Sequence, residues 1–103
     1  MRKKLIAANW KMYKTPEEAR SFVRDFLPLV AEQERDEIVL CVPYIDLAAT
    51  LEAVRGSNVR VGAQNLHWEK EGAFTGEISA AMLLTHGVTH VIIGHSERRQ
   101  YFA

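Results

Sequence analysis

The chain has 103 residues, 48% of them hydrophobic, and its 13 basic and 13 acidic residues give a formal net charge of +0. This composition argues against a disordered tail, and the balanced charge gives no electrostatic basis for binding nucleic acid or an anionic membrane. No apolar run approaches the roughly 18 residues that a membrane-spanning helix needs. We therefore expect one globular unit over residues 1–103, with no internal domain boundary.

Two features of the chain bear on its cellular compartment. The first residues, MRKKLIAANW, begin with the basic cluster typical of a secretory signal peptide. The apolar stretch that follows covers only residues 5–8, which is too short for the hydrophobic region of such a signal. Cys41 is the only cysteine, so it cannot form an internal disulfide, and its apolar neighbours predict a buried structural thiol rather than a nucleophile. Both features favour a reducing, cytoplasmic location.

The first half of the chain predicts a strand, a helix and a second strand. Residues 5–10 (LIAANW) are an apolar run typical of a strand. Thr15 as N-cap, Pro16 at the first helical position and Glu18 as its capping-box partner predict where the helix begins. Apolar residues at helical spacing continue to Val30, and Pro28 is expected to loosen the last turns. The second strand is predicted over residues 37–43 (EIVLCVP).

The second half continues the alternation. Further strands are predicted over 59–65 and 90–94, and helices over 46–56, over 79–87 and from residue 96 onward. Ser79 is the expected N-cap of its helix, and Gly56 and Gly87 are the expected terminators. A polar loop of about a dozen residues follows the third strand, and loops of this length in compact domains usually have a function.

Strands that alternate with helices, and that are apolar along their whole length, predict an α/β fold with a parallel sheet. Chemistry in such folds gathers at the carboxyl ends of the strands. The residues at these ends are mostly polar or titratable: Asn9, Trp10, Lys11, Pro43, Tyr44, Gln64, Asn65, His95, Ser96 and Glu97. We therefore expect a site at this edge of the sheet.

His95 is the strongest candidate within this set. It lies between a strand and a helix, so the positive end of the helix dipole should disfavour the imidazolium. A neutral histidine there can donate a hydrogen bond to a substrate carbonyl. The plainer interpretations are a structural histidine, a solvated Lys11 and a helix-stabilising Glu97. No dinucleotide-binding or P-loop motif is present, and we expect neither a cofactor nor a metal, since the remaining histidines lack the spacing of metal ligands: His67, His86 and His90.

Three motifs occur in the order and spacing of the triosephosphate isomerases, and the chain resembles this family throughout: AANWKM at 7–12, GAQNLHWEKEGAFTGEIS at 62–79 and VIIGHSERR at 91–99. The resemblance implies a (β/α)8 TIM barrel of about 250 residues, of which residues 1–103 supply the N-terminal half, from the first strand to the start of the fourth helix. Two segments depart from the usual pattern. MYKT follows Lys11 where Asn-Gly is common, and CVPYIDL replaces a Cys-Pro-Pro-Phe type of segment.

The resemblance also implies catalytic roles. Asn9 and Lys11 match the substrate-binding pair, with Lys11 as the cation beside the phosphorylated triose and its developing oxyanion. His95 matches the neutral electrophile, whose lowered pKa is a known property of this family. Ser96 matches a substrate-binding residue and Glu97 a catalytic one that supports the histidine.

The family is homodimeric, and four further residues match its subunit interface. Thr75 matches the tip of the loop that reaches into the neighbouring subunit. Glu77 and Arg98 match a pair that ties the subunits together, and Met12 matches a residue in the same interface.

The implied reaction interconverts dihydroxyacetone phosphate and D-glyceraldehyde 3-phosphate through an enediolate, by proton transfer, in glycolysis and gluconeogenesis. The family's general-base glutamate, its lid and its phosphate-binding loops belong to later strands, outside residues 1–103. We therefore expect residues 1–103 to be inactive alone. The alternative is a freestanding α/β module that acts in binding or assembly, with the loop around Thr75 as its contact surface.

Overall fold

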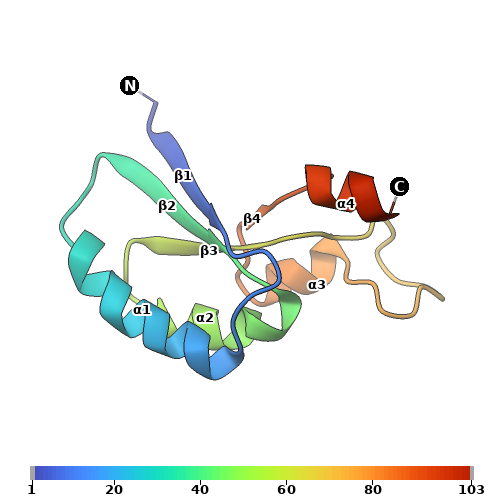
Figure 1. Ribbon diagram of the computed structural model, residues 1–103, viewed down its shortest axis with the longest axis horizontal. Coiled ribbons are helices and arrows are strands. Elements are labelled where there is room, and N and C mark those ends of the chain that lie inside the picture. Colours follow the sequence, from blue (N-terminus) through green and yellow to red (C-terminus); the bar gives the residue numbers. More distant parts are fainter. Residues whose placement is uncertain (1, 103) are drawn as a thin grey trace.

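A computed structural model describes residues 2–102 and contains one four-stranded parallel sheet (Figure 1). Its strands are β1 (Lys4–Asn9), β2 (Asp36–Cys41), β3 (Val59–Ala63) and β4 (His90–Val91), and they lie side by side in chain order. The pairing places Asn9, Cys41, Gly62 and His90 in one row across the sheet. The residues that follow the carboxyl ends of the strands lie beyond this row.

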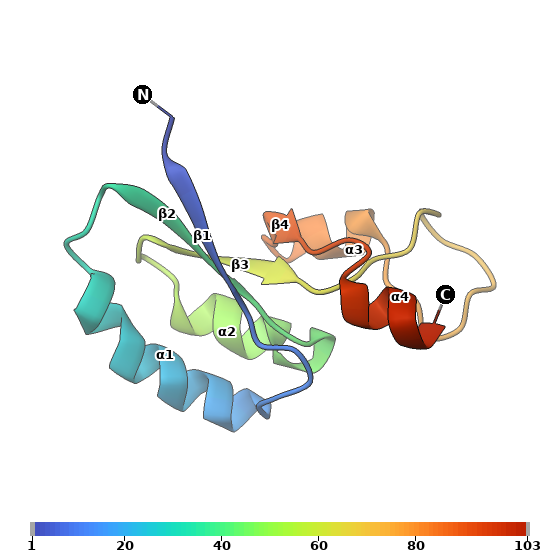
Figure 2. The same cartoon turned by 45° about the horizontal axis from the view of Figure 1, so that its top comes forward.

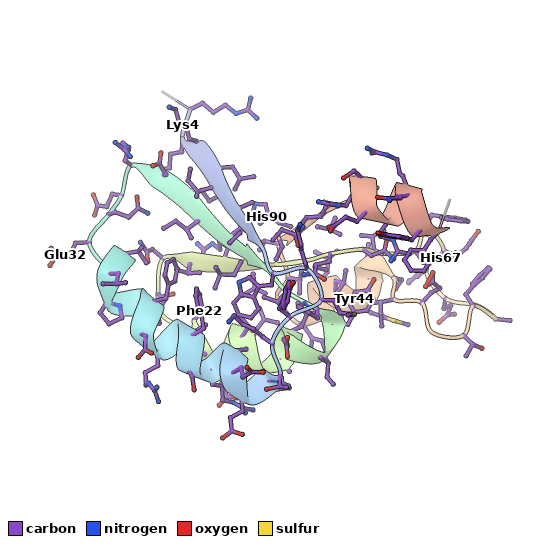
Figure 3. All side chains as sticks on the ribbon, in the orientation of Figure 1. Lys4, Phe22, Glu32, Tyr44, His67 and His90 are labelled. Carbon is purple, nitrogen blue, oxygen red and sulfur yellow. The ribbon has the colours of Figure 1, made fainter. Side chains whose placement is uncertain are left out.

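The first helix is built as its sequence predicts. Helix α1 (Pro16–Val30) begins at the predicted N-cap: Thr15 Oγ1 accepts from Glu18 N at 3.3 Å, and Glu18 Oε1 accepts from Thr15 N at 3.0 Å. The helix continues through Pro28, so the proline does not end it early. Phe22 points from α1 toward the end of β1 (Figure 3) and meets the Trp10 ring edge-on, with 5.3 Å between the ring centroids.

The core lies between the sheet and two helices. Helix α1 and helix α2 (Leu47–Ala53) pack against each other and cover the same side of the sheet, as Figures 1 and 2 show. The buried residues between these layers include Val23, Leu40, Leu47 and Val61. Cys41 is also buried, and burial raises the pKa of its thiol, which confirms the prediction of a structural cysteine.

β1 is open on both faces. Leu5 and Ile6 are 53% and 51% exposed, and successive residues of a strand point to opposite sides of the sheet. The sheet therefore has uncovered apolar surface on both sides at this edge. This is the surface that the rest of a closed barrel would cover.

Two predicted elements are shorter than expected. The helix predicted over 46–56 is a 3-10 turn, η1 (Tyr44–Asp46), followed by α2, which ends at Ala53. Tighter bonds, from Arg55 N to Glu52 O and from Ser57 N to Val54 O, lead the chain out of the helix toward Gly56, which has a φ of 78°. Gly56 has the positive φ expected of a helix terminator, but the regular α-helix already ends at Ala53.

The strands predicted over 59–65 and 90–94 are also shorter. β3 ends at Ala63, so it offers β4 no partner beyond that residue. The ladder to β4 pairs only Gly62 with His90 and Ala63 with Val91. Its last bond runs from Ile92 N to Ala63 O. Similarly, the strand predicted over 37–43 lies at 36–41.

The last helices agree with the sequence. Helix α3 (Ala80–Thr85) is capped by Ser79, whose side chain accepts from Met82 N, and the chain turns at Gly87 with a φ of 89°. Helix α4 (Ser96–Phe102) follows β4. None of the helices within residues 2–102 is long and apolar enough to cross a bilayer.

Candidate active site

A cavity of about 660 Å³ opens at the carboxyl ends of the strands. The structure gathers most of the predicted site residues around it: Asn9, Lys11, Met12, Glu77, His95, Glu97 and Arg98. Ser96 and Thr75 do not line it. Ser96 is the exposed first residue of α4, and Thr75 is exposed in the loop between β3 and α3.

Lys11 has a constrained backbone at the mouth of this cavity. Its φ is 56°, in the left-handed region, which costs an L-residue with a Cβ about 1–2 kcal/mol. Two hydrogen bonds hold it there: Lys11 N donates to Asn9 Oδ1 at 2.9 Å, and Lys11 O accepts from Gln64 Nε2 at 2.8 Å. Such strain persists only where the surroundings fix it, so Lys11 is placed by Asn9 and Gln64 together.

Gln64 had no role assigned from the sequence beyond its place at a strand end. Its Nε2 lies within hydrogen-bond distance of the carbonyl oxygens of Lys11 (2.8 Å) and Cys41 (3.1 Å), and of Asn9 Oδ1 (3.4 Å). One amide thus joins the ends of β1 and β2 to the end of β3. The sequence indicated only that Gln64 follows a strand, because its contacts with backbone carbonyls do not depend on the residue types of its partners.

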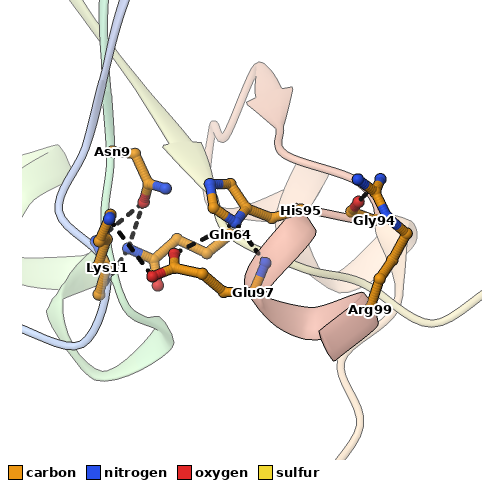
Figure 4. A network of polar contacts seen from close by, with 7 residues as sticks. All are labelled: Asn9, Lys11, Gln64, Gly94, His95, Glu97 and Arg99. Carbon is orange, nitrogen blue, oxygen red and sulfur yellow. Dashed lines mark hydrogen bonds and ion pairs between the residues drawn. The ribbon is translucent and has the colours of Figure 1, made fainter. Parts of the chain in front are cut away.

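Glu97 connects the lysine to the histidine. Its Oε2 lies 3.3 Å from Lys11 Nζ, and its Oε1 lies 3.2 Å from His95 Nδ1 (Figure 4). Both Lys11 and Glu97 are half-exposed, so their ion pair contributes no more than about 1 kcal/mol to stability. Its consequence is geometric, because it brings three chemically active groups into one row along the cavity.

The Nδ1 atom of His95 has two contacts that require opposite protonation states. The backbone N–H of Glu97 donates to Nδ1 at 3.1 Å, which needs a free lone pair. An ion pair with Glu97 Oε1 would need a proton on the same atom. We assign the acceptor state, because a backbone N–H in the first turn of a helix always carries its proton, whereas the carboxylate already has Lys11 as a partner. The ring proton then lies on Nε2, which is left as a donor.

The loop between β3 and α3 forms another wall of the cavity and is closed at its base. His67 N donates to Ile78 O at 2.7 Å, and the His67 ring lies between Trp68 and Phe74, with centroids 4.2 and 4.3 Å away. Glu77 Oε2 lies 3.8 Å from His67 Nδ1. The loop therefore has a self-packed base, with its tip outside this packing.

Tyr44 attaches the start of the same loop to η1 (Figure 3). Its hydroxyl donates to Asn65 O at 2.5 Å. Burial raises the pKa of Tyr44, and the negative charge of Glu77 adds to the effect, while Arg98 opposes it. The hydroxyl therefore keeps its proton as a donor.

The remaining predicted residues are exposed. Met12 is 92% exposed, and the Arg98 guanidinium lies over the Phe102 ring at 5.0 Å. In the part of the chain that the structure describes, Glu77 and Arg98 do not form an ion pair with each other. Within residues 2–102, no group of three or more histidine, cysteine, aspartate or glutamate side chains is placed to hold a metal ion.

A parallel sheet in consecutive strand order, with polar side chains at the carboxyl ends of its strands, is the arrangement of part of a (β/α)-barrel. Comparison with known proteins shows the family. The family model described as triosephosphate isomerase matches residues 4–103, and the chain belongs to this family.

Curated triosephosphate isomerases are similar over the whole chain. The protein from Solibacter usitatus (strain Ellin6076) is 62% identical over 102 residues, which cover 99% of this chain and 41% of that protein. The protein from Synechocystis sp. (strain ATCC 27184 / PCC 6803 / Kazusa) is 57% identical over 103 residues, covering 99% and 43%. The chain thus spans about two-fifths of the length of these relatives.

A solved structure gives the same result for the fold. The crystal structure of triosephosphate isomerase from Bartonella henselae is 39% identical, with a TM-score of 0.89, and the match covers 98% of this chain and 41% of the other. The expected fold class, the N-terminal half of a TIM barrel, is therefore confirmed.

Proposed function

We propose that this chain forms the N-terminal part of a triosephosphate isomerase, which interconverts dihydroxyacetone phosphate and D-glyceraldehyde 3-phosphate through an enediolate. The observation that carries the proposal is the row of contacts from Lys11 through Glu97 to His95 beside one cavity. It joins a cation, a carboxylate and an imidazole with a free N–H, the groups that isomerisation of a carbonyl compound needs for charge stabilisation and proton transfer.

Each catalytic residue has a role that its contacts support. Lys11 supplies positive charge toward the anionic substrate and the developing oxyanion, and Asn9 fixes the Lys11 backbone. His95 donates from Nε2 to the substrate carbonyl, because Nδ1 is occupied by the Glu97 N–H. Glu97 holds Lys11 through its carboxylate and His95 through its backbone N–H. Ser96, which is exposed at the start of α4 and does not line the cavity, is assigned to substrate binding on the motif alone.

The general base must come from outside this set. The Glu97 carboxylate is engaged by Lys11, and Glu77 lies beside His67. General acid–base catalysis typically contributes about 10²–10⁴ in rate. We therefore propose that residues 1–103 have no useful isomerase activity alone, and that activity requires the complete isomerase that contains them.

We further propose that the complete protein is a cytoplasmic homodimer. Met12, Thr75, Glu77 and Arg98 are all exposed in the single chain, so their side chains are available to a second copy. Glu77 and Arg98 both lie near Tyr44, and the charge of each affects the Tyr44 pKa, but among residues 2–102 they do not pair with each other. Both are exposed, so a residue of a second subunit can reach Arg98, and can reach Glu77 on the side away from His67.

The test is an isomerase assay on the complete protein, on Lys11→Met and on Lys3→Met as a matched control, since Lys3 is an exposed lysine ahead of β1. We expect Lys11→Met to lose activity by at least about a hundredfold, as expected for removal of a charge aimed at the transition state, and Lys3→Met to keep it. Residues 1–103 assayed separately should be inactive. A complete protein that self-associates without isomerase activity would instead favour the binding or assembly module.

A further inference from the structure

Arg99 holds both of the peptide carbonyls that flank the side chain of His95. Its Nη1 donates to Gly94 O at 2.6 Å, and its backbone N–H donates to His95 O at 3.1 Å. The second bond is an ordinary helical bond that any residue except proline can make. The first depends on the arginine side chain. In Figure 4, Arg99 and Gly94 lie on the other side of His95 from Lys11.

The chain at this point is not held by the sheet. β4 ends at Val91, and its last ladder bond is donated by Ile92. Gly94 has a φ of 62°, so the chain bends sharply between strand and helix, and the space where a Gly94 Cβ would lie is open. Neither the ladder nor close packing therefore fixes the plane of the Gly94–His95 peptide.

The orientation of that peptide sets the direction of the His95 side chain. A peptide is planar, so fixing the Gly94 carbonyl also fixes the backbone nitrogen of His95 and limits where its Cα–Cβ bond can point. A charged donor at 2.6 Å makes a strong hydrogen bond. Arginine also suits the task because its donors are rigidly arranged and its charge is permanent.

We propose that Arg99 is a positioning residue for His95. It holds the Gly94–His95 peptide so that Nδ1 stays on the Glu97 N–H and Nε2 faces the substrate. This inference rests on the isomerase function proposed above. Arg99 does not line the cavity, whereas its neighbour Arg98 does, so the two consecutive arginines have different tasks.

The test compares Arg99→Met and Arg99→Lys with Arg55→Met in the complete protein. Arg55 is an exposed arginine that follows α2, outside the cavity, and serves as the matched control. We expect kcat to fall about tenfold to a hundredfold for Arg99→Met, since a misplaced catalytic group can cost that much. Arg99→Lys, which keeps one charged donor, should lose less. KM should change by less than about twofold, because Arg99 does not contact the substrate cavity.

A spectroscopic measurement separates positioning from stability. The ¹⁵N signals of the His95 ring, recorded well below each variant's unfolding temperature, should shift for Arg99→Met and stay unchanged for Arg55→Met. A kcat for Arg99→Met within twofold of the control, or a lowered kcat with an unchanged ring spectrum, would overturn the inference. If the unsubstituted protein has no isomerase activity, the proposed function fails, and the ring spectra alone still decide whether Arg99 orients His95.

Discussion

Replacing Gly62 by alanine should destabilise the protein through a clash in the middle of the sheet. A Cβ at this position would lie 2.9 Å from Cys41 Sγ, 3.1 Å from His90 O and 3.2 Å from His90 Cβ. The sulfur can move only within a buried environment, and the carbonyl belongs to the two-pair ladder between β3 and β4. Both neighbouring strands therefore oppose the added methyl group.

The magnitude follows from two opposing effects. Overpacking a well-packed interior costs about 1–3 kcal/mol. Alanine recovers about 0.5–1 kcal/mol of that, because glycine loses more backbone freedom when it is fixed in a strand. Gly62 does not have a positive φ, so alanine adds no backbone strain of its own. The two ranges together span about 0–2.5 kcal/mol, and we expect a net loss in the free energy of unfolding near the middle, about 1 kcal/mol, because the contacts at 2.9–3.2 Å come from both neighbouring strands.

Urea denaturation of the complete protein measures this loss, and a double-mutant cycle locates its cause. Cys41→Ala removes the atom nearest to the new Cβ, so Gly62→Ala should cost less in the Cys41→Ala background than in the original protein. A Gly62→Ala protein as stable as the original would refute the reasoning. Equal costs in the two backgrounds would show that the sulfur is not the obstacle.

Substitutions at three other positions test separate features of the chain. Thr15→Ala should lower the free energy of unfolding by about 1 kcal/mol and Thr15→Ser by much less, since serine keeps the cap; thermal melts of both variants would show equal losses if the capping box were unimportant. Gln64→Ala should lower kcat/KM about tenfold or more by freeing the Lys11 backbone, and steady-state kinetics indistinguishable from the original would contradict this role. Asp46 is fully buried, and neither of its carboxylate oxygens has a hydrogen-bond partner among residues 2–102. Burial, aided by the charge of Glu18, raises the pKa of Asp46 above 3.8. The folded state then binds more protons than the unfolded state above pH 3.8, so stability should fall as the pH rises through the raised pKa. Asp46→Asn should remove that fall and be more stable than the original near pH 7; melts from pH 4 to 8 that run parallel for both proteins would contradict this expectation.

The parts of the fold that are specified locally were predictable from the sequence. The capping box at Thr15, the cap at Ser79 and the turn at Gly87 depend on residues within three or four positions of each other, and all are present. Strand lengths were not predictable in this way. Residues 92–94 are as apolar as a strand, but they lie outside it because β3 ends at Ala63 and provides no further partner.

The candidate site, like the fold, was predictable from the sequence only in part. Polar residues at strand ends indicated where the cavity would be, and the motifs named the residues that line it. The contacts of Gln64 and Arg99 could not be predicted, because both depend on side chains that reach backbone carbonyls. Every residue has a backbone carbonyl, so the sequence does not show which carbonyl a side chain will bind.

The row that joins Asn9, Cys41, Gly62 and His90 has a consequence for how this chain tolerates insertions and deletions. Side chains alternate between the two faces of a strand. Removing one residue within β1, while its start stays paired with β2, would bring Trp10 to the level of Cys41 and turn Asn9 away from Gln64. Removing a residue from the loop between β3 and α3 leaves the row intact. We expect changes in length to accumulate in that loop, while the strands that deliver Asn9 and Gln64 keep a constant number of residues.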